Sequence, residues 1–201
     1  MTPTKRTLDV VGAILLLLIL APFIAVMALI IWAIDGGPVF FVSERMKTPT
    51  IGFALIKFRT MKPAVGDSGV SGADKANRIT RTGAFLRRTR LDEVPQLWNI
   101  LRGDISFVGP RPPLRQYVER YPEIYGPVLQ SVPGITGLAT LYFHAHEERL
   151  LARSRSLAET DAIYIRSCIP RKARLDMIYQ RRRNLCMDAA IMFKTAFRRR
   201  S

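Results

Sequence analysis

The sequence predicts an α+β, mostly helical protein that has an N-terminal membrane segment and one compact domain. Three observations predict it: an uncharged apolar run near the N-terminus, two short strand-like stretches after it, and helical, arginine-rich sequence towards the C-terminus. A chain of 201 residues suits one domain plus an attachment. We therefore divide it into a membrane helix over residues 1–35 and a membrane-associated domain over residues 36–201.

The apolar run extends from Val10 to Ile34 and contains no charged side chain. It exceeds the roughly 7–15 residues of a signal-peptide core, and no A-x-A cleavage site follows, so we expect it to be retained. Pro22 removes one helical hydrogen bond near the centre and predicts a kink. A straight helix reaches roughly 37 Å and can span, whereas a sharp bend leaves arms of about 18 Å, too short for a roughly 30 Å core. The residues alone favour a kinked spanning helix, because prolines are common in such helices.

The charge of the chain indicates its class of partner. Lys and Arg outnumber Asp and Glu by 31 to 16, which points to nucleic acid, an anionic membrane surface or phosphorylated substrates. Residues 171–201 contain ten basic side chains against two Asp, and each basic residue near an anionic leaflet contributes about 1 kcal/mol of attraction. No nucleic-acid motif or stacking platform accompanies this charge. We therefore expect anionic inner-leaflet lipid, and no nucleic acid, as a partner.

Two strand-like stretches follow the apolar run. PVFFVSERM and IGFALIKFRTM, residues 38–46 and 51–61, flank a polar turn and predict a β-hairpin. Residues 63–78 are rich in Gly, Ser and Asp and predict an exposed loop of the kind that closes over substrates.

The central sequence predicts helices over residues 84–90 and 92–101, the second ended by Gly103. Asp92 and Glu93 open the second helix, where such a pair is ordinarily a cap or a solvated charge. The prolines of GPRPP, residues 109–113, force extended backbone. Arg111 then lies on a stiff arm that either clamps an anion or faces solvent. VPGITG, residues 132–137, predicts a turn.

The sequence from Glu147 onward predicts mainly helix. Cys168 and Cys186 lack metal or redox spacing and predict free thiols in a reducing compartment. His144 and His146 have no further His or Cys ligands nearby, which favours a surface or core role over a metal site. Helical spacing predicts one buried stripe in the tail. The stripe consists of Ile178, Leu185, Ala189, Met192 and Ala196.

Several separated stretches are together similar to one family, the bacterial sugar transferases known as monotopic phosphoglycosyl transferases. They cover most of the chain in the family's order, and the central block is too long and specific for chance similarity. The stretches are KRTLD, GGPVFF, KFRTM, ITRTGAFLRRTRLDEVPQLWNILRGDISFVGPRPP, VPGITG and DMIYQRRRNLCMDAAIMFKT.

The resemblance implies a different membrane topology from the residues alone. It implies a re-entrant helix–break–helix that breaks at Ala21 and Pro22 and returns to the side from which it entered. A compact catalytic domain with a small β-hairpin and interfacial amphipathic helices then rests on the cytoplasmic face of the bacterial inner membrane. Many family members have Ser before the proline, where this chain has Ala21. No heptad or self-complementary pattern fixes the oligomeric state, and a homo-oligomer stays open.

The resemblance also implies a reaction. The family transfers a sugar-1-phosphate from a UDP-sugar to a polyprenyl phosphate such as undecaprenyl phosphate, releases UMP, and uses Mg²⁺. In this sequence Asp92 matches the nucleophile, which forms an aspartyl phosphosugar intermediate. Glu93 matches the second catalytic carboxylate, which holds the Mg²⁺. The metal and nearby cations neutralise the charge that spreads over the phosphoryl oxygens.

Six further residues match substrate-binding positions of the family. Two arginines of the central block, Arg87 and Arg111, can make paired hydrogen bonds to phosphate. Lys57 and Arg59 of KFRTM bind phosphate, or instead position a strand or bind lipid headgroups. Asp176 and Tyr179 of DMIY lie near the site or are structural. In that order the residues are Arg87, Arg111, Lys57, Arg59, Asp176 and Tyr179.

The chain departs from the common family pattern over residues 139–175, where many members carry Gln-Val and Gly-Arg-Asn stretches. The sugar stays open among glucose, galactose, N-acetylated and diamino sugars. The product stays open among capsule, exopolysaccharide, O-antigen and glycoprotein glycan. Two other classes also stay open: a non-catalytic, membrane-anchored basic module that binds anionic lipid or polymer, and a nucleic-acid-binding membrane protein, whose affinity would fall steeply with salt.

Overall fold

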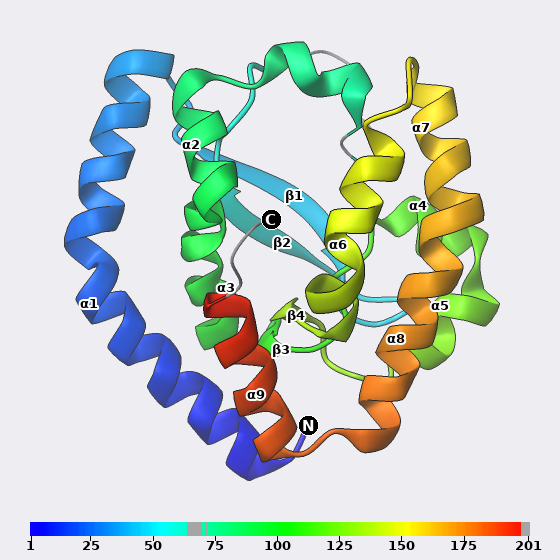
Figure 1. The fold of residues 1–201 in the computed structure, drawn as a ribbon. Coiled ribbons are helices and arrows are strands. Elements are labelled where there is room, and N and C mark those ends of the chain that lie inside the picture. The colour runs from blue at the N-terminus through cyan, green and yellow to red at the C-terminus, as the bar shows by residue number, and fades with distance from the viewer. Residues whose placement is uncertain (64–69, 71, 198–201) are drawn as a thin grey trace.

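The computed structural model describes residues 1–63, 70 and 72–197. It is mostly helical, with one long apolar helix at the N-terminus and a small antiparallel sheet, as the sequence predicts. Figure 1 shows the hairpin near the centre, with α1, α2 and α3 on one side and α6, α7 and α8 on the other. The site described below lies between these two sides.

The first helix, α1 (Pro3–Asp35), begins where the side chain of Thr2 accepts a hydrogen bond from a backbone N–H, and it ends at Gly36, whose φ is 74°. Its backbone stays helical through Ala21 and Pro22. Figure 1 shows the helix bending near its middle. The expected helix–break–helix is therefore one continuous helix with a bend, because the proline removes a single hydrogen bond of the ladder.

One face of α1 packs against the domain and the other is exposed. Ala13, Met27 and Ile31 are buried and share hydrophobic clusters with side chains of the later elements. The outward residues are large and apolar, for example Leu18 at 70% exposure and Trp32 at 65%. By length and composition the helix is apolar enough to cross a membrane. Its outer face is thus a surface suited to lipid.

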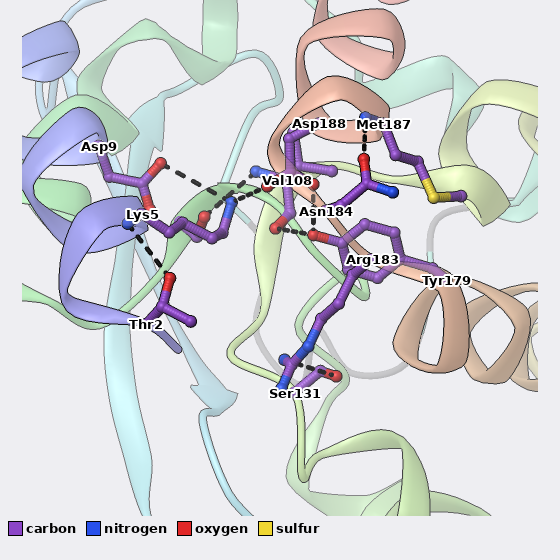
Figure 2. Close-up of polar contacts among 11 residues, drawn as sticks. Thr2, Lys5, Asp9, Val108, Ser131, Tyr179, Arg183, Asn184, Met187 and Asp188 are labelled. Atoms are coloured by element: carbon purple, nitrogen blue, oxygen red, sulfur yellow. Dashed lines mark hydrogen bonds and ion pairs between the residues drawn. The ribbon is translucent and has the colours of Figure 1, made fainter.

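Polar contacts attach the N-terminal end of α1 to the end of the chain. Lys5 Nζ lies 2.5 Å from Asp188 Oδ2 and 3.9 Å from Asp9 Oδ1. The hydroxyl of Tyr179 donates to Asp188 Oδ1 at 2.7 Å and to the carbonyl of Val108 at 3.1 Å. Figure 2 shows Lys5 between the two aspartates, with Tyr179 on the other side of Asp188. A further contact comes from the neighbouring residue of α1, Arg6.

The Arg6 guanidinium donates to the carbonyls of Ile100 at 2.6 Å and Leu101 at 2.9 Å. These carbonyls belong to the last turn of α3 (Leu97–Arg102), where a cation is favourable because helical carbonyls lack partners. The N-terminal end of α1 is therefore held to two different elements of the domain.

The C-terminal end of α1 is held as firmly. Arg59 donates to the carbonyl of Asp35 at 2.8 Å, to that of Gly37 at 3.1 Å, and to that of Gly36. The carboxylate of Asp35 accepts a hydrogen bond from the hydroxyl of Thr80 at 2.9 Å. Both ends of α1 are thus fixed to the same domain.

The hairpin predicted after α1 is confirmed. β1 (Phe40–Met46) pairs antiparallel with β2 (Gly52–Phe58). Of the sixteen residues of the loop expected at 63–78, seven, namely 64–69 and 71, lie outside the described residues. Its last part, Ala73–Arg78, forms a 3-10 helix, η1.

The two central helices lie close to the predicted ranges. They appear as α2 (Arg81–Thr89), a 3-10 turn η2 (Leu91–Gln96) and α3, which ends at Gly103 with φ 82° as expected. Arg90 joins α2 to η2 with φ 60°, in the left-handed region. Asp92 and Glu93 lie inside η2 rather than at a cap.

GPRPP forms neither helix nor strand and bends at Gly109 and Pro110, and part of VPGITG is a strand rather than a turn. β3 (Ser106–Val108) pairs in parallel with β4 (Gly134–Thr136). A Cβ on Gly134 would lie 2.2 Å from the backbone nitrogen of Gly109, so only glycine allows this approach of the two segments. The turn residues therefore serve strand pairing.

The remaining helices build the other side of the domain, and the buried stripe expected in the tail is wrong. Ile178, Leu185 and Met192 are 38–44% exposed, whereas Asp188 and Ile191 are buried. The polar contacts of Asp188 turn that side of the last helix inward. The helices are α4 (Arg115–Arg120), α5 (Pro122–Val128), α6 (Leu138–Leu151), α7 (Leu157–Ile163), the π-helical turn η3 (Tyr164–Cys168), α8 (Ile169–Arg182) and α9 (Leu185–Ala196).

Candidate active site

A cavity of about 630 Å³ opens between the hairpin and η2 on one side and α6, η3 and α8 on the other. This volume lies within the range of small-molecule sites. Six of the residues singled out in the sequence line it, although they come from elements far apart in the chain. They are Lys57, Arg87, Asp92, Glu93, Arg111 and Asp176.

The acidic pair is buried in one wall of the cavity. Asp92 and Glu93 are 8% and 9% exposed. Arg111 lies 2.5 Å from Glu93 Oε1 and donates to it. Among the described residues, no side chain or backbone group donates a hydrogen bond to the Asp92 carboxylate. One carboxylate is therefore fixed within the protein, and the other remains available to a ligand.

The environment separates the acidities of the two carboxyls. Burial, and then the charge of Glu93, raise the pKa of Asp92 above its usual range. Burial also opposes ionisation of Glu93, but the charge and hydrogen bond of Arg111 hold its pKa below the ordinary value. Glu93 is thus a fixed anion, and the charge on Asp92 depends on the cations that face it.

Five of the cations that line the cavity lie around the pair: Arg45, Lys57, Arg87, Arg90 and Arg111. Against two carboxylates they leave a surplus of positive charge, which suits a polyphosphate ligand. Burial lowers the pKa of Lys57 to about 8, although the charge of Asp92 opposes this shift. Arg87 is oriented by a hydrogen bond from its Nε to the hydroxyl of Thr60 at 2.8 Å.

Arg45 is a member of this group that sequence reasoning missed. In the antiparallel ladder Phe41, four residues before Arg45 in β1, lies opposite Lys57 of β2. Because side chains two residues apart share a face of a strand, Arg45, Phe41 and Lys57 lie on one face of the hairpin. This alternation was the signal in the sequence that could have found it.

The opposite wall comes from the part of the chain that departs from the family pattern. Glu147 of α6 pairs with Lys172 of α8 at 2.8 Å, and Lys172 also donates to the hydroxyl of Tyr164 at 3.3 Å. Burial opposes ionisation of Glu147, but hydrogen bonds from His144 and Lys172 hold its pKa at about 2. Burial raises the pKa of Asp176 to about 7. No sequence motif pointed to Glu147, Lys172 or Tyr164.

The two histidines take different places. His144 lines the cavity, with Nε2 3.1 Å from Glu148 Oε1, although the sequence favoured a surface or core role. His146 instead lies 3.0 Å from a nitrogen of Arg171 outside the cavity.

Two of the predicted site residues do not line the cavity. Arg59 directs its guanidinium to the carbonyls at the end of α1, and Tyr179 joins Asp188 to the backbone of Val108. Figure 2 shows Tyr179 in the cluster that holds the N-terminal end of α1. Both side chains position structural elements around the site.

The acidic pair fits the Mg²⁺ that the resemblance implies. In the described part of the chain no group of three or more His, Cys, Asp or Glu side chains is arranged to hold a metal. Mg²⁺, however, is commonly bound through one or two carboxylates together with substrate phosphates, and not by a cage of protein ligands. Arg111 occupies Oε1 of Glu93. The second oxygen of Glu93 and the carboxylate of Asp92 are the donors that remain.

The sequence profile of one family, described as bacterial sugar transferase, matches residues 1–199. The chain belongs to the bacterial sugar transferase family. The cavity described above is therefore the candidate active site of a sugar transferase family member, and its acidic pair lies in the long central block of the chain.

Three relatives show the range of named activities in the family. A Caulobacter vibrioides UDP-glucose:undecaprenyl-phosphate glucose-1-phosphate transferase is 42% identical over 140 residues, 67% of this chain and 52% of its own. An Escherichia coli protein of the same name is 39% identical over 166 residues, 81% of this chain and 36% of its own. A Salmonella typhimurium undecaprenyl-phosphate galactose phosphotransferase is 35% identical over 153 residues, 67% of this chain and 31% of its own. The chain thus spans a third to a half of these relatives.

Proposed function

We propose that this sugar transferase family member transfers a sugar-1-phosphate from a UDP-sugar to undecaprenyl phosphate, or a related polyprenyl phosphate, and releases UMP. The observation that carries the proposal is the buried pair of Asp92 and Glu93, which five cations face in one cavity. The three relatives described above are named as glucose and galactose transferases that use undecaprenyl phosphate. The reaction is the first membrane step in making a glycoconjugate.

In the first half-reaction an Asp92 oxygen attacks the phosphorus that carries the sugar. A bond forms between that oxygen and phosphorus, the pyrophosphate P–O bond breaks, and its electron pair leaves with UMP. Lys57, Arg87 and Arg111 counter the repulsion between the anionic nucleophile and the diphosphate. Within the described residues no group donates a hydrogen bond to the Asp92 carboxylate, so it is available to this phosphorus.

In the second half-reaction an oxygen of the polyprenyl phosphate attacks the same phosphorus. The bond to Asp92 breaks, and its electron pair restores the carboxylate, so the product is a polyprenyl diphosphate sugar. The two steps need no net gain or loss of protons if the acceptor reacts as its dianion. One aspartate therefore serves both substrates in turn.

Glu93 and Asp92 are the residues that would hold Mg²⁺ together with the substrate phosphates. When bound, the ion neutralises phosphoryl charge and helps the UMP oxygen to leave. Arg111 fixes Glu93 in its ionised form, so this residue is ready to act as a ligand throughout the reaction.

We place the domain on the cytoplasmic face of the inner membrane, with α1 entering and leaving by the same side. Lys5 and Arg6 hold one end of α1 to the domain and Arg59 holds the other. A helix whose two ends are fixed to one folded domain cannot place those ends on opposite sides of a bilayer. The exposed apolar side chains of α9 and its basic surroundings suit contact with anionic lipid.

The first prediction concerns turnover. Purified protein with Mg²⁺ and undecaprenyl phosphate should release UMP from at least one member of a UDP-sugar panel that includes glucose, galactose and N-acetylated and diamino sugars. Asp92→Asn should lower this rate by about 10³-fold or more, because an amide is a poor nucleophile. Asp161→Asn is the matched control, because it makes the same change outside the cavity.

Full activity of a folded Asp92→Asn protein would exclude the assigned nucleophile. Absence of UMP release across the panel, together with saturable binding to anionic vesicles, would favour the non-catalytic basic module instead. That module should also be insensitive to Glu93→Gln.

A second prediction concerns pH. The Lys57 ammonium, with a pKa of about 8, is present below that pH and is lost above it. The value of kcat/KM for the UDP-sugar should therefore fall as the pH rises from 7 to 9.5. Lys57→Arg keeps its charge over this range and should remove the alkaline fall, whereas Lys62→Arg, an exposed control, should not. An unchanged fall in Lys57→Arg would show that another group titrates.

A third prediction concerns topology. With Cys186 replaced by Ser, Thr2→Cys should react with an impermeant maleimide in inverted inner-membrane vesicles but not in intact spheroplasts. Gly37→Cys, at an exposed position with room for a side chain, should behave identically, because both ends of α1 share one side. Labelling of Thr2→Cys alone in spheroplasts would establish a spanning helix.

A further inference from the structure

A second, smaller cavity of about 220 Å³ adjoins the active site. Two residues, Arg90 and Glu93, line both cavities, so the two cavities share Glu93 of the acidic pair. The small cavity lies between α1 and the domain and takes its walls from seven elements. The remaining lining residues are Leu16, Leu20, Val94, Leu97, Phe107, Ile135, Thr136, Thr140 and Thr195.

The walls of this groove are apolar. Leu16 and Leu20 belong to the apolar run in α1, six and two residues before Pro22. Leu16 is still 37% exposed, so the groove reaches the outer surface of the helix. The groove thus runs from the outer surface of α1 to Arg90 and Glu93, which also line the active-site cavity.

The hydroxyls in the groove serve the protein itself. The hydroxyls of Thr136 and Thr195 lie 2.8 Å apart, and Thr195 also donates to the carbonyl of Ile191 at 2.8 Å. They are therefore not arranged as a site for sugar hydroxyls or for a nucleoside base. The groove suits a hydrocarbon chain.

The inner end of the groove is charged. Arg90 adopts φ 60°, a conformation that is uncommon for a residue with a Cβ and that often marks a ligand site. Its backbone N–H ends α2 by bonding to the carbonyls of Arg87 and Leu86. This strained turn brings the Arg90 side chain to the junction of the groove with the active site, next to Glu93.

We propose that the groove binds the first isoprene units of the polyprenyl phosphate acceptor, with its phosphate beside Arg90. An apolar chain that ends in an anion matches apolar walls that end in a guanidinium. The inference rests on the proposed function and adds the place of the acceptor. The donor then reaches Asp92 through the cavity of about 630 Å³, and the acceptor approaches from the membrane side along α1.

The test narrows the groove with Leu16→Trp and compares it with Leu18→Trp. Leu18 lies on the same helix but is 70% exposed and does not line the groove. Two rates are measured: the single burst of UMP from donor alone, and steady turnover against undecaprenyl phosphate concentration. Leu16→Trp should lower kcat/KM for the acceptor roughly tenfold or more and leave the burst unchanged. Leu18→Trp should change neither rate.

Wild-type acceptor kinetics in Leu16→Trp would overturn the proposal, and so would an equal loss of the donor burst, which would indicate damage to the fold or the donor site.

A second measurement does not depend on turnover. A diazirine-bearing polyprenyl phosphate should label the peptide that contains Leu16 and Leu20 in both wild type and Asp92→Asn, and undecaprenyl phosphate should compete. Labelling confined to other peptides would overturn the assignment.

The two measurements distinguish a failure of the proposed function from a failure of the groove assignment. If no donor gives a UMP burst from wild type, the proposed function fails, while photolabelling still decides whether the groove binds the polyprenyl chain. If the burst occurs and labelling lies elsewhere, the function stands and the groove is not the acceptor site.

Discussion

The burial of two adjacent carboxylates is the constraint on which the rest of the site depends. Asp92 and Glu93 lie next to each other with little exposure, and like charges removed from water repel unless cations accompany them. Lys57, Arg87 and Arg111 supply that charge from the hairpin, from α2 and from the proline-rich arm. Each of these elements therefore has to be held in place for the pair to remain ionised.

The apolar helix contributes to this arrangement and also presents an outer face suited to lipid. Arg59, two residues after Lys57, donates hydrogen bonds to carbonyls at the C-terminal end of α1. Arg6, near the start of α1, donates to carbonyls at the C-terminal end of α3. The hairpin and the segment that carries Asp92 are thus both connected to α1 by arginines. Contact with lipid and the geometry of the catalytic cavity depend on the same helix.

Much of the fold and of the near wall of the site follows from local sequence. Strand-like stretches around a polar turn predict the hairpin, Gly103 ends the helix it was expected to end, and the proline-rich segment around Arg111 forms no helix. The far wall could not be predicted in this way. Glu147 and Lys172 are 25 residues apart and meet only because α6 packs on α8.

Two predictions show where local pattern is insufficient. KFRTM places Lys57 and Arg59 together, but β2 ends at Phe58, and Arg59 turns to the carbonyls of α1. In α9 the apolar stripe predicted a buried face, yet Asp188 faces inward because Lys5 and Tyr179 bind its carboxylate. Partners distant in sequence decided both outcomes.

The measurement that tests the central claim most directly is the intact mass of the protein after incubation with its UDP-sugar and Mg²⁺ in the absence of acceptor. The account predicts a mass gain equal to one sugar phosphate, located on the peptide that contains Asp92, and its loss when undecaprenyl phosphate is added. Asp92→Asn should show no gain. Turnover by wild type without any such adduct, including after rapid quenching, would contradict the account.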